Sequence, residues 1–275
     1  MGVVDQNGDQ TGIPAHPHPG LVPDRNGGRR AEPAPSCQGR LDTFVDAAFA
    51  FSLTLLVISY NQLPDSVAEL REALRRVPVF VVCFALVGMF WNAHRLWRNR
   101  YTLEDGRSVL LSLALVMVVL IYVYPLRMVM SSFLALLTGG WVPSELELSA
   151  ASPGADLQLA FLIYSLGFGL MAVLIWRLNV HALRCAGVDG LERYDTASEA
   201  GAYALMACVA GVSAGLSVIL MVLDLPLRGG AAFLVALPMW TYAGLGIAMP
   251  WYWARRGRRR SGQAIPSDDG EPITG

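Results

Sequence analysis

The sequence predicts an all-α integral membrane protein that crosses the bilayer six times. Of its 275 residues, 54% are hydrophobic and only 16% are charged, whereas a soluble domain carries about 25% charged residues. The apolar residues also gather in runs of the length that a membrane-spanning helix needs, about 20 residues. So few charged residues cannot cover a surface that faces water, so most of the chain is expected to lie in lipid.

Six apolar runs qualify as spanning helices. In chain order they lie at residues 42–60, 77–97, 108–130, 157–176, 202–223 and 231–253. Strands of a membrane barrel would be about ten residues long and would alternate strictly between apolar and polar side chains, which the run 109–123 does not do. Residues 41–254 are therefore expected to form one helical membrane domain.

The two ends of the chain differ in composition from this domain. Residues 1–40 are rich in Pro, Gly and charged residues, and residues 255–275 begin with five arginines and end polar. Such segments bury too little apolar surface to offset the entropy of ordering. We expect both to be disordered tails.

Arginine supplies all 21 basic residues, and its placement predicts an orientation. With six spans, the side that holds both termini carries 16 arginines and the opposite side carries five. Basic residues concentrate in the cytoplasmic segments of membrane proteins. We therefore expect a multi-pass protein of the cell membrane with both termini in the cytoplasm.

Small residues within the spans permit neighbouring helices to approach closely. Gly167 and Gly169 lie in the fourth predicted span, and Gly211 and Gly215 have the GxxxG spacing in the fifth. This spacing occurs at the contacts of membrane helices, although small residues are common throughout these spans.

Several functional classes lack the motifs that they need. The chain has no nucleotide-binding Gly-x-x-x-x-Gly-Lys, no His-Glu-x-x-His, and no TVGYG potassium filter, and its four cysteines form no CxxC pair. We expect no enzyme activity, no bound metal or other cofactor, and no nucleic-acid partner.

The first span carries charge where lipid makes it costly. Asp46 lies about one turn inside this span, and an acidic residue there is a functional hypothesis in itself. The second span ends at the same side of the membrane with Trp91, Asn92 and His94. Asp46 is expected to reach one of these three donors or Arg40. A structural hydrogen-bonded network is the favoured interpretation, with gating or proton relay as the alternative.

These residues also carry a family resemblance. The pattern Arg40-x-x-x-Phe44-Val45-Asp46 resembles the R-x-x-x-F-S-D signature that opens the first helix of the transmembrane protein 175 family. The Trp91-x-x-His94 pattern is similar to that family's second helix. The sequence departs from the signature at Val45, which replaces a serine and removes one hydroxyl from the polar cluster.

The resemblance implies a potassium-permeable channel in which four six-helix units surround one pore lined by the first helix. It assigns an apolar constriction to Phe51, Leu55 and Ile58, and ion selectivity to Thr54. The three constriction positions share one helical face; without the resemblance they would be ordinary packing surface. The resemblance also implies a structural or gating polar network, formed by Arg40, Phe44, Asp46, Trp91, Asn92 and His94.

The expected partners follow from this assignment. They are three further copies of the chain, the lipid bilayer, and permeant potassium, with sodium and protons as further candidate ions. The alternative function is a proton-coupled secondary transporter that uses Asp46 and His94.

Overall fold

The structure is a computed structural model of the chain. It describes residues 21–23, 29–31, 37–58, 65–101, 103, 105–149, 152–187, 190–223 and 234–263. Most residues of the two predicted tails lie outside this set. Within the tails, strands β1 (Leu21–Pro23) and β2 (Arg29–Ala31) pair antiparallel.

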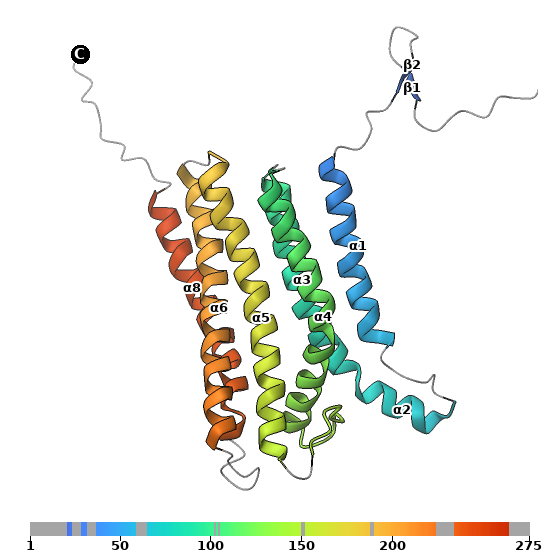
Figure 1. Cartoon of the computed structure of the whole chain (residues 1–275). Coiled ribbons are helices and arrows are strands. Elements are labelled where there is room, and N and C mark those ends of the chain that lie inside the picture. Colours follow the sequence, from blue (N-terminus) through green and yellow to red (C-terminus); the bar gives the residue numbers. More distant parts are fainter. Residues whose placement is uncertain are drawn as a thin grey trace, which may run out of the picture.

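Within the described residues, six long helices run side by side (Figure 1). They are α1 (Cys37–Ile58), α3 (Val77–Arg100), α4 (Gly106–Leu137), α5 (Pro153–Cys185), α6 (Gly190–Leu223) and α8 (Leu237–Gln263). The short helix α2 (Val67–Arg75) leads into α3 and projects to one side of the bundle, beyond the end of α1 (Figure 1). The start of α1 and the end of α8 both lie at the other end of the bundle, on opposite sides of it (Figure 1).

Four helical stretches in the described part of the chain are long and apolar enough to cross a membrane. They are Val67–Arg100, Gly106–Leu137, Pro153–Cys185 and Gly190–Leu223. Each coincides with a predicted span, and the chain is a multi-pass membrane protein. The predicted first and last spans correspond to α1 and α8, which run alongside these four.

The helices extend beyond the apolar runs that predicted them. Helix α6 begins at Gly190, whereas the apolar run begins at 202, and α8 continues to Gln263 through the first part of the predicted C-terminal tail. Nothing in these polar flanks breaks a helix, so the backbone continues past the apolar part. The turn between α5 and α6 comes where Gly187 and Gly190 take φ values of 60° and 58°, which favour glycine.

Helix α1 lies at one edge of the bundle, packed mainly against α3 and α4, while α5 and α6 form the broadest helix contact. The buried centre of the bundle is aromatic. The rings of Phe90 and Phe168 meet edge to face at 5.4 Å, and those of Tyr164 and Tyr242 meet at 5.1 Å. These ring contacts join α3, α5 and α8. Helix α1 lies outside this group, so one of its sides faces outward.

Close helix approach occurs at only one of the two predicted glycine pairs. A Cβ at Gly167 would overlap the Tyr122 ring of α4, and one at Gly169 would lie 3.0 Å from the Ala210 side chain of α6. At Gly211 and Gly215, a Cβ would meet no described atom within 4 Å. The GxxxG pair therefore makes no close contact within the described part of the chain, because its small face does not point at a neighbouring helix.

Candidate functional site

Helix α1 has two distinct faces. Val45, Phe49, Ser52 and Leu56 repeat at helical spacing and are all at most 2% exposed, so this stripe packs into the bundle. On the other side, Phe51 is 55% exposed and Thr54 is exposed as well. Because residues 51 and 54 lie about half a turn from the buried stripe, they face away from the rest of the chain.

The other two constriction positions are placed less completely. Leu55 is half-buried at the margin between the two faces. Ile58 is the last residue of α1, and its side chain lies outside the described residues. The backbone puts residue 58 on the same helical face as residues 51 and 54.

The hydroxyl of Thr54 is oriented by its own helix. Its Oγ1 donates a hydrogen bond to the Phe51 carbonyl oxygen at 2.7 Å. A hydroxyl has one donor and two acceptor lone pairs. Because the proton is directed at the backbone, the lone pairs of the Thr54 hydroxyl are left on the outward side of the helix.

At the start of α1, Asp46 contacts one of its four predicted partners. The indole Nε1 of Trp91 on α3 donates to the Asp46 Oδ1 at 2.9 Å. The guanidinium of Arg95 lies 5.3 Å from the Trp91 ring centre, so positive charge lies close to this contact. Asp46 is exposed in the single chain, but its carboxylate faces α3.

His94 has a different partner. It is 2% exposed, and its Nε2 forms a 2.9 Å hydrogen bond with the Ser112 Oγ of α4. Asp46 and His94 nevertheless border one small hollow of about 50 Å³, together with Asp42, Arg95, Arg98 and Asn99. Of the predicted network, Asp46 and His94 line this hollow, and they belong to separate hydrogen bonds.

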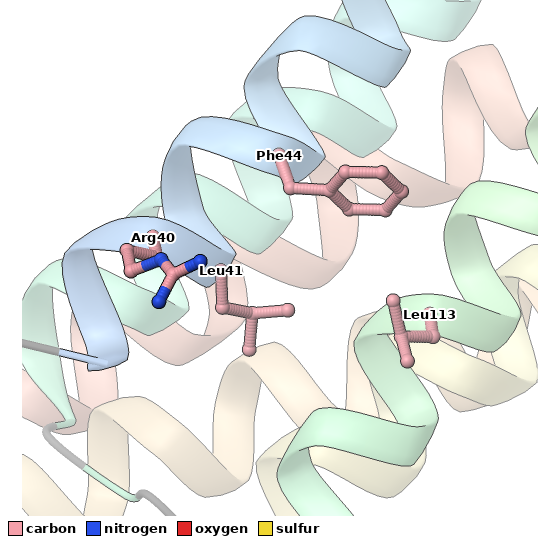
Figure 2. Close-up of a pocket in the computed structure, with 4 residues that line it drawn as sticks. All are labelled: Arg40, Leu41, Phe44 and Leu113. Atoms are coloured by element: carbon pink, nitrogen blue, oxygen red, sulfur yellow. The ribbon is translucent and has the colours of Figure 1, made fainter.

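The remaining predicted network residues lie elsewhere. Arg40 and Phe44 line an open hollow of about 410 Å³ between α1 and α4, with Leu41 and Leu113 (Figure 2). The Phe44 side chain is 53% exposed, and Asn92 is exposed on α3. None of the hydrogen bonds given for the described residues joins Arg40, Phe44 or Asn92 to Asp46.

An ion pair next to Asp46 was not predicted from the sequence. The Nε of Arg98, a residue 6% exposed, donates to the Asp42 Oδ1 at 2.6 Å, and its Nη1 donates to the Leu103 carbonyl at 3.0 Å. The usable signal was spacing: Asp42 and Asp46 are one helical turn apart on α1, and Trp91 and Arg98 are two turns apart on α3, so each pair shares one helical face.

A second charged cluster lies at the opposite end of α1. Arg127 of α4 is 8% exposed, and its Nη2 donates to the Glu145 Oε1 at 2.6 Å, while its Nη1 lies 3.4 Å from the Leu56 carbonyl of α1. The Arg76 guanidinium is 3.7 Å from the same Glu145 oxygen. An arginine within an apolar run should have signalled this cluster from the sequence, as Asp46 did.

A third polar contact joins α5 to the start of α4. The His181 Nε2 lies 2.8 Å from the Asp105 Oδ2, and the Ser108 hydroxyl donates to the Asp105 Oδ1 at 2.6 Å. The Ser108 hydrogen bond, followed by the charge and hydrogen bond of His181, lowers the pKa of the Asp105 carboxyl. An ionised Asp105 also suits the N-cap position that it occupies on α4.

Within the described ranges, no three His, Cys, Asp or Glu side chains come close enough together to hold a metal ion.

Known proteins resemble this chain both in sequence and in structure. The family model of the endosomal/lysosomal potassium channel TMEM175 matches residues 40–125. A potassium channel from Marivirga tractuosa is 33% identical over 180 residues, which cover 62% of this chain and 71% of that protein. The crystal structure of a threonine-to-alanine variant of the potassium channel MtTMEM175, in complex with a nanobody–MBP fusion, matches with a TM-score of 0.59 and 28% identity. That match covers 77% of this chain and 93% of the other.

The family match begins at Arg40 and includes both Asp46 and the end of α3. The structural match extends well beyond it, across most of the bundle. The chain therefore belongs to the TMEM175 family.

Proposed function

We propose that the chain is the subunit of a potassium-permeable cation channel whose pore is lined by the outward face of α1. In this proposal α1 and α8 complete a set of six transmembrane helices. Both termini lie in the cytoplasm, and the protein resides in the cell membrane. Sodium and protons are the other ions that the pore is expected to admit to some degree.

The observation that carries the proposal is the position of α1 at the edge of its own bundle. Its inner stripe is fully buried, whereas Phe51 and Thr54 face outward and remain exposed among the described residues. A single chain offers no enclosed path along this face. A closed symmetric assembly would turn four such faces toward one axis, so we propose a homotetramer.

Ion passage in this arrangement depends on an apolar constriction. Phe51, Leu55 and Ile58 would exclude water when the pore is narrow, because a hydrophobic constriction gates by dewetting. Thr54 lies between them in the sequence and offers the oxygen lone pairs described above. It is the position proposed to favour potassium over sodium.

Two substitutions test the constriction. Leu55→Asn and Ile58→Asn would each add four amides around the axis, lower the cost of stripping water from the ion, and raise potassium flux into liposomes several-fold. The matched control is Leu166→Asn, an apolar-to-amide change at a 58% exposed position of α5, which should leave flux unchanged. Unaltered flux in both α1 variants, if they assemble normally, would show that α1 does not line the pore.

Selectivity and assembly are measured on the same preparations. Thr54→Ala should lower the potassium preference while current persists, because it removes a ligand without narrowing the path. Native mass spectrometry should give a tetramer. A strict monomer could not enclose a pore along α1 and would refute the proposed channel.

A proton-coupled transporter is the alternative that the same residues allow. It would use Asp46 and His94, yet these two side chains bond to Trp91 and Ser112 respectively. Single-channel recording separates the two functions, because unitary currents require ions to pass far faster than a carrier can turn over.

A further inference from the structure

The end of α8 carries basic and aromatic side chains in direct succession. Trp251 and Trp253 are 57% and 45% exposed, and tryptophan concentrates where a membrane meets water. Three described arginines follow within five residues, namely Arg255, Arg256 and Arg258, which we call the arginine cluster. The cluster therefore lies at the level of the lipid headgroups.

A hollow of about 190 Å³ opens within this segment. It is lined by Trp251, Tyr252, Arg255 and Arg256. The Arg255 guanidinium lies 3.6 Å from the centre of the Trp251 ring, a cation–π contact that holds the charged group against the aromatic face. One wall of the hollow is thus apolar and the other cationic.

Arg256 is held in place by α6. Its Nη1 donates to the Ser198 Oγ at 3.1 Å, and the Tyr194 hydroxyl donates to the Arg256 carbonyl at 3.1 Å. The Tyr252 hydroxyl donates to the Ser198 carbonyl at 2.8 Å. A Cβ at Gly201 would overlap that hydroxyl, so α8 reaches this position only because residue 201 has no side chain.

The charge of the cluster is not neutralised by the contacts described. Among the ion pairs between described residues, none includes Arg255, Arg256 or Arg258. Arg256 bonds to a neutral hydroxyl, and Arg255 lies on an aromatic ring. Each guanidinium has five N–H donors, so most of these donors remain for an anion in the hollow.

An apolar track leads into the hollow from the membrane side. Ile247, Trp251 and Arg255 follow one another at intervals of four residues, so they line one face of α8. Ile247 is 80% exposed. A ligand with a hydrocarbon chain and an anionic head would lie along this face, with its chain on Ile247 and Trp251 and its head at Arg255.

We propose that the arginine cluster and the hollow beside it bind the phosphate of an anionic phospholipid. The planar guanidinium fork matches two phosphate oxygens at once, and basic residues next to a spanning helix attract anionic lipids. Free inorganic phosphate has the same head chemistry but cannot use the apolar track. Lipid is therefore the expected source of the phosphate.

The test is native mass spectrometry of the purified full-length chain, titrated with phosphatidylglycerol or with phosphatidylcholine. We expect phosphatidylglycerol to bind the wild type at least about tenfold more tightly. The pair Arg255→Gln and Arg256→Gln should lose roughly that preference. The matched control pair, Arg184→Gln and Arg193→Gln, removes two exposed arginines elsewhere and should keep it.

Two further variants separate charge from folding. The pair Arg255→Lys and Arg256→Lys keeps the charge and should keep most of the preference, and it carries the test if the Gln pair unfolds. Gly201→Ala keeps both arginines but displaces Tyr252 and Arg256, so binding should weaken several-fold.

Three results would overturn the proposal. They are equal binding of the two lipids by the wild type, an unchanged preference in a folded Gln pair, and loss of the preference in a folded Lys pair. Competition by inorganic phosphate at a concentration equal to that of the lipid would show that the site takes a free anion, which also contradicts a lipid site.

Discussion

Asp42 and Asp46 lie one turn apart on α1, and each meets a different residue of α3. Arg98 binds Asp42 and Trp91 binds Asp46. Arg98 and Trp91 are seven residues apart, which is two turns of a helix. Two polar contacts on one shared face therefore fasten the second and third turns of α1 to the last three turns of α3.

The Asp46–Trp91 hydrogen bond is expected to support stability more than selectivity. Asp46→Ala leaves the indole donor of Trp91 without its acceptor, and the change should lower stability and tetramer yield. A double-mutant cycle with Asp46→Asn and Trp91→Phe should give a coupling energy of about 1 kcal/mol in thermal unfolding. A variant that assembles normally but alters ion preference would place Asp46 in the pore instead.

Arg127 is expected to matter more, because both partners of its ion pair are largely buried. Its side chain is 9% exposed and that of Glu145 is 15% exposed. Arg127→Met would leave Glu145 charged beside Arg76 alone, at a cost of about 3–5 kcal/mol, measured as loss of thermal stability in detergent.

The control for Arg127 is the exposed pair of Arg75 and Glu72, whose side chains are 33% and 41% exposed. Glu72→Gln should cost less than about 1 kcal/mol. Similar losses in the two variants would mean that the Arg127 pair is solvated.

The sequence identifies charged residues in costly places but not their partners. Asp46 stands out because lipid surrounds its span, and the same argument applies to Arg127. The partner of Arg127 is Glu145, which lies 18 residues away in a loop, and no pattern in the sequence brings the two together. Likewise, His94 finds Ser112 on a third helix, because the packing of α3 against α4 decides that contact.

Helix α5 approaches its neighbours closely at two glycines. The absence of a side chain at Gly167 admits the Tyr122 ring of α4, and the small Gly169 lies against Ala210 of α6. In a membrane, helices associate through close packing, since lipid tails are as apolar as the helices themselves. The close α4–α5 contact therefore requires glycine at position 167, because the methyl group of an alanine there would overlap the Tyr122 ring.

Gly167→Ala is expected to destabilise the bundle by about 1–3 kcal/mol, the usual range for overpacking. Gly211→Ala is the matched control, because a Cβ there meets no described atom within 4 Å and alanine is the better helix former. Thermal unfolding should show a lower midpoint for the first variant and an equal or higher one for the second. The opposite order would contradict the α4–α5 packing described here.

Apolar runs predict the existence and order of the helices but not their ends. The thickness of the bilayer sets the length of an apolar run that spans it. Four of the six predicted runs coincide with helices that are long and apolar enough to cross a membrane. Helix ends depend on local backbone signals such as Gly187 and Gly190, which an apolar run does not contain. Helix α2 was missed because nine residues of mixed character resemble a loop, although Ser66 caps it through the Glu69 N–H.

At the scale of the whole molecule, the orientation in the membrane can be tested with one thiol. Cys185 is exposed at the end of α5, on the side that the arginine count places in the cytoplasm. In a variant with Cys37→Ser and Cys208→Ser, an impermeant maleimide should label Cys185 only after the cells are permeabilised.

The control for orientation is a new thiol in the loop between α4 and α5. Leu148→Cys, at a position 38% exposed, should react in intact cells. If Cys185 reacts in intact cells and the new thiol does not, the chain has the opposite orientation.

The way α1 is held has a mechanical consequence. The first half of α1 is fastened to α3 through Asp42 and Asp46, and its last turn lies against Arg127 through the Leu56 carbonyl. Between these points, the inner contacts of α1 are mainly apolar and non-directional. A helix held at two points bows most midway between them, and Phe51 lies midway between Asp46 and Leu56. In the proposed tetramer, lateral pressure from the bilayer would thus bend the middle of each α1 and change the width of the pore. The contacts of α1 with α3 and with Arg127 would stay in place.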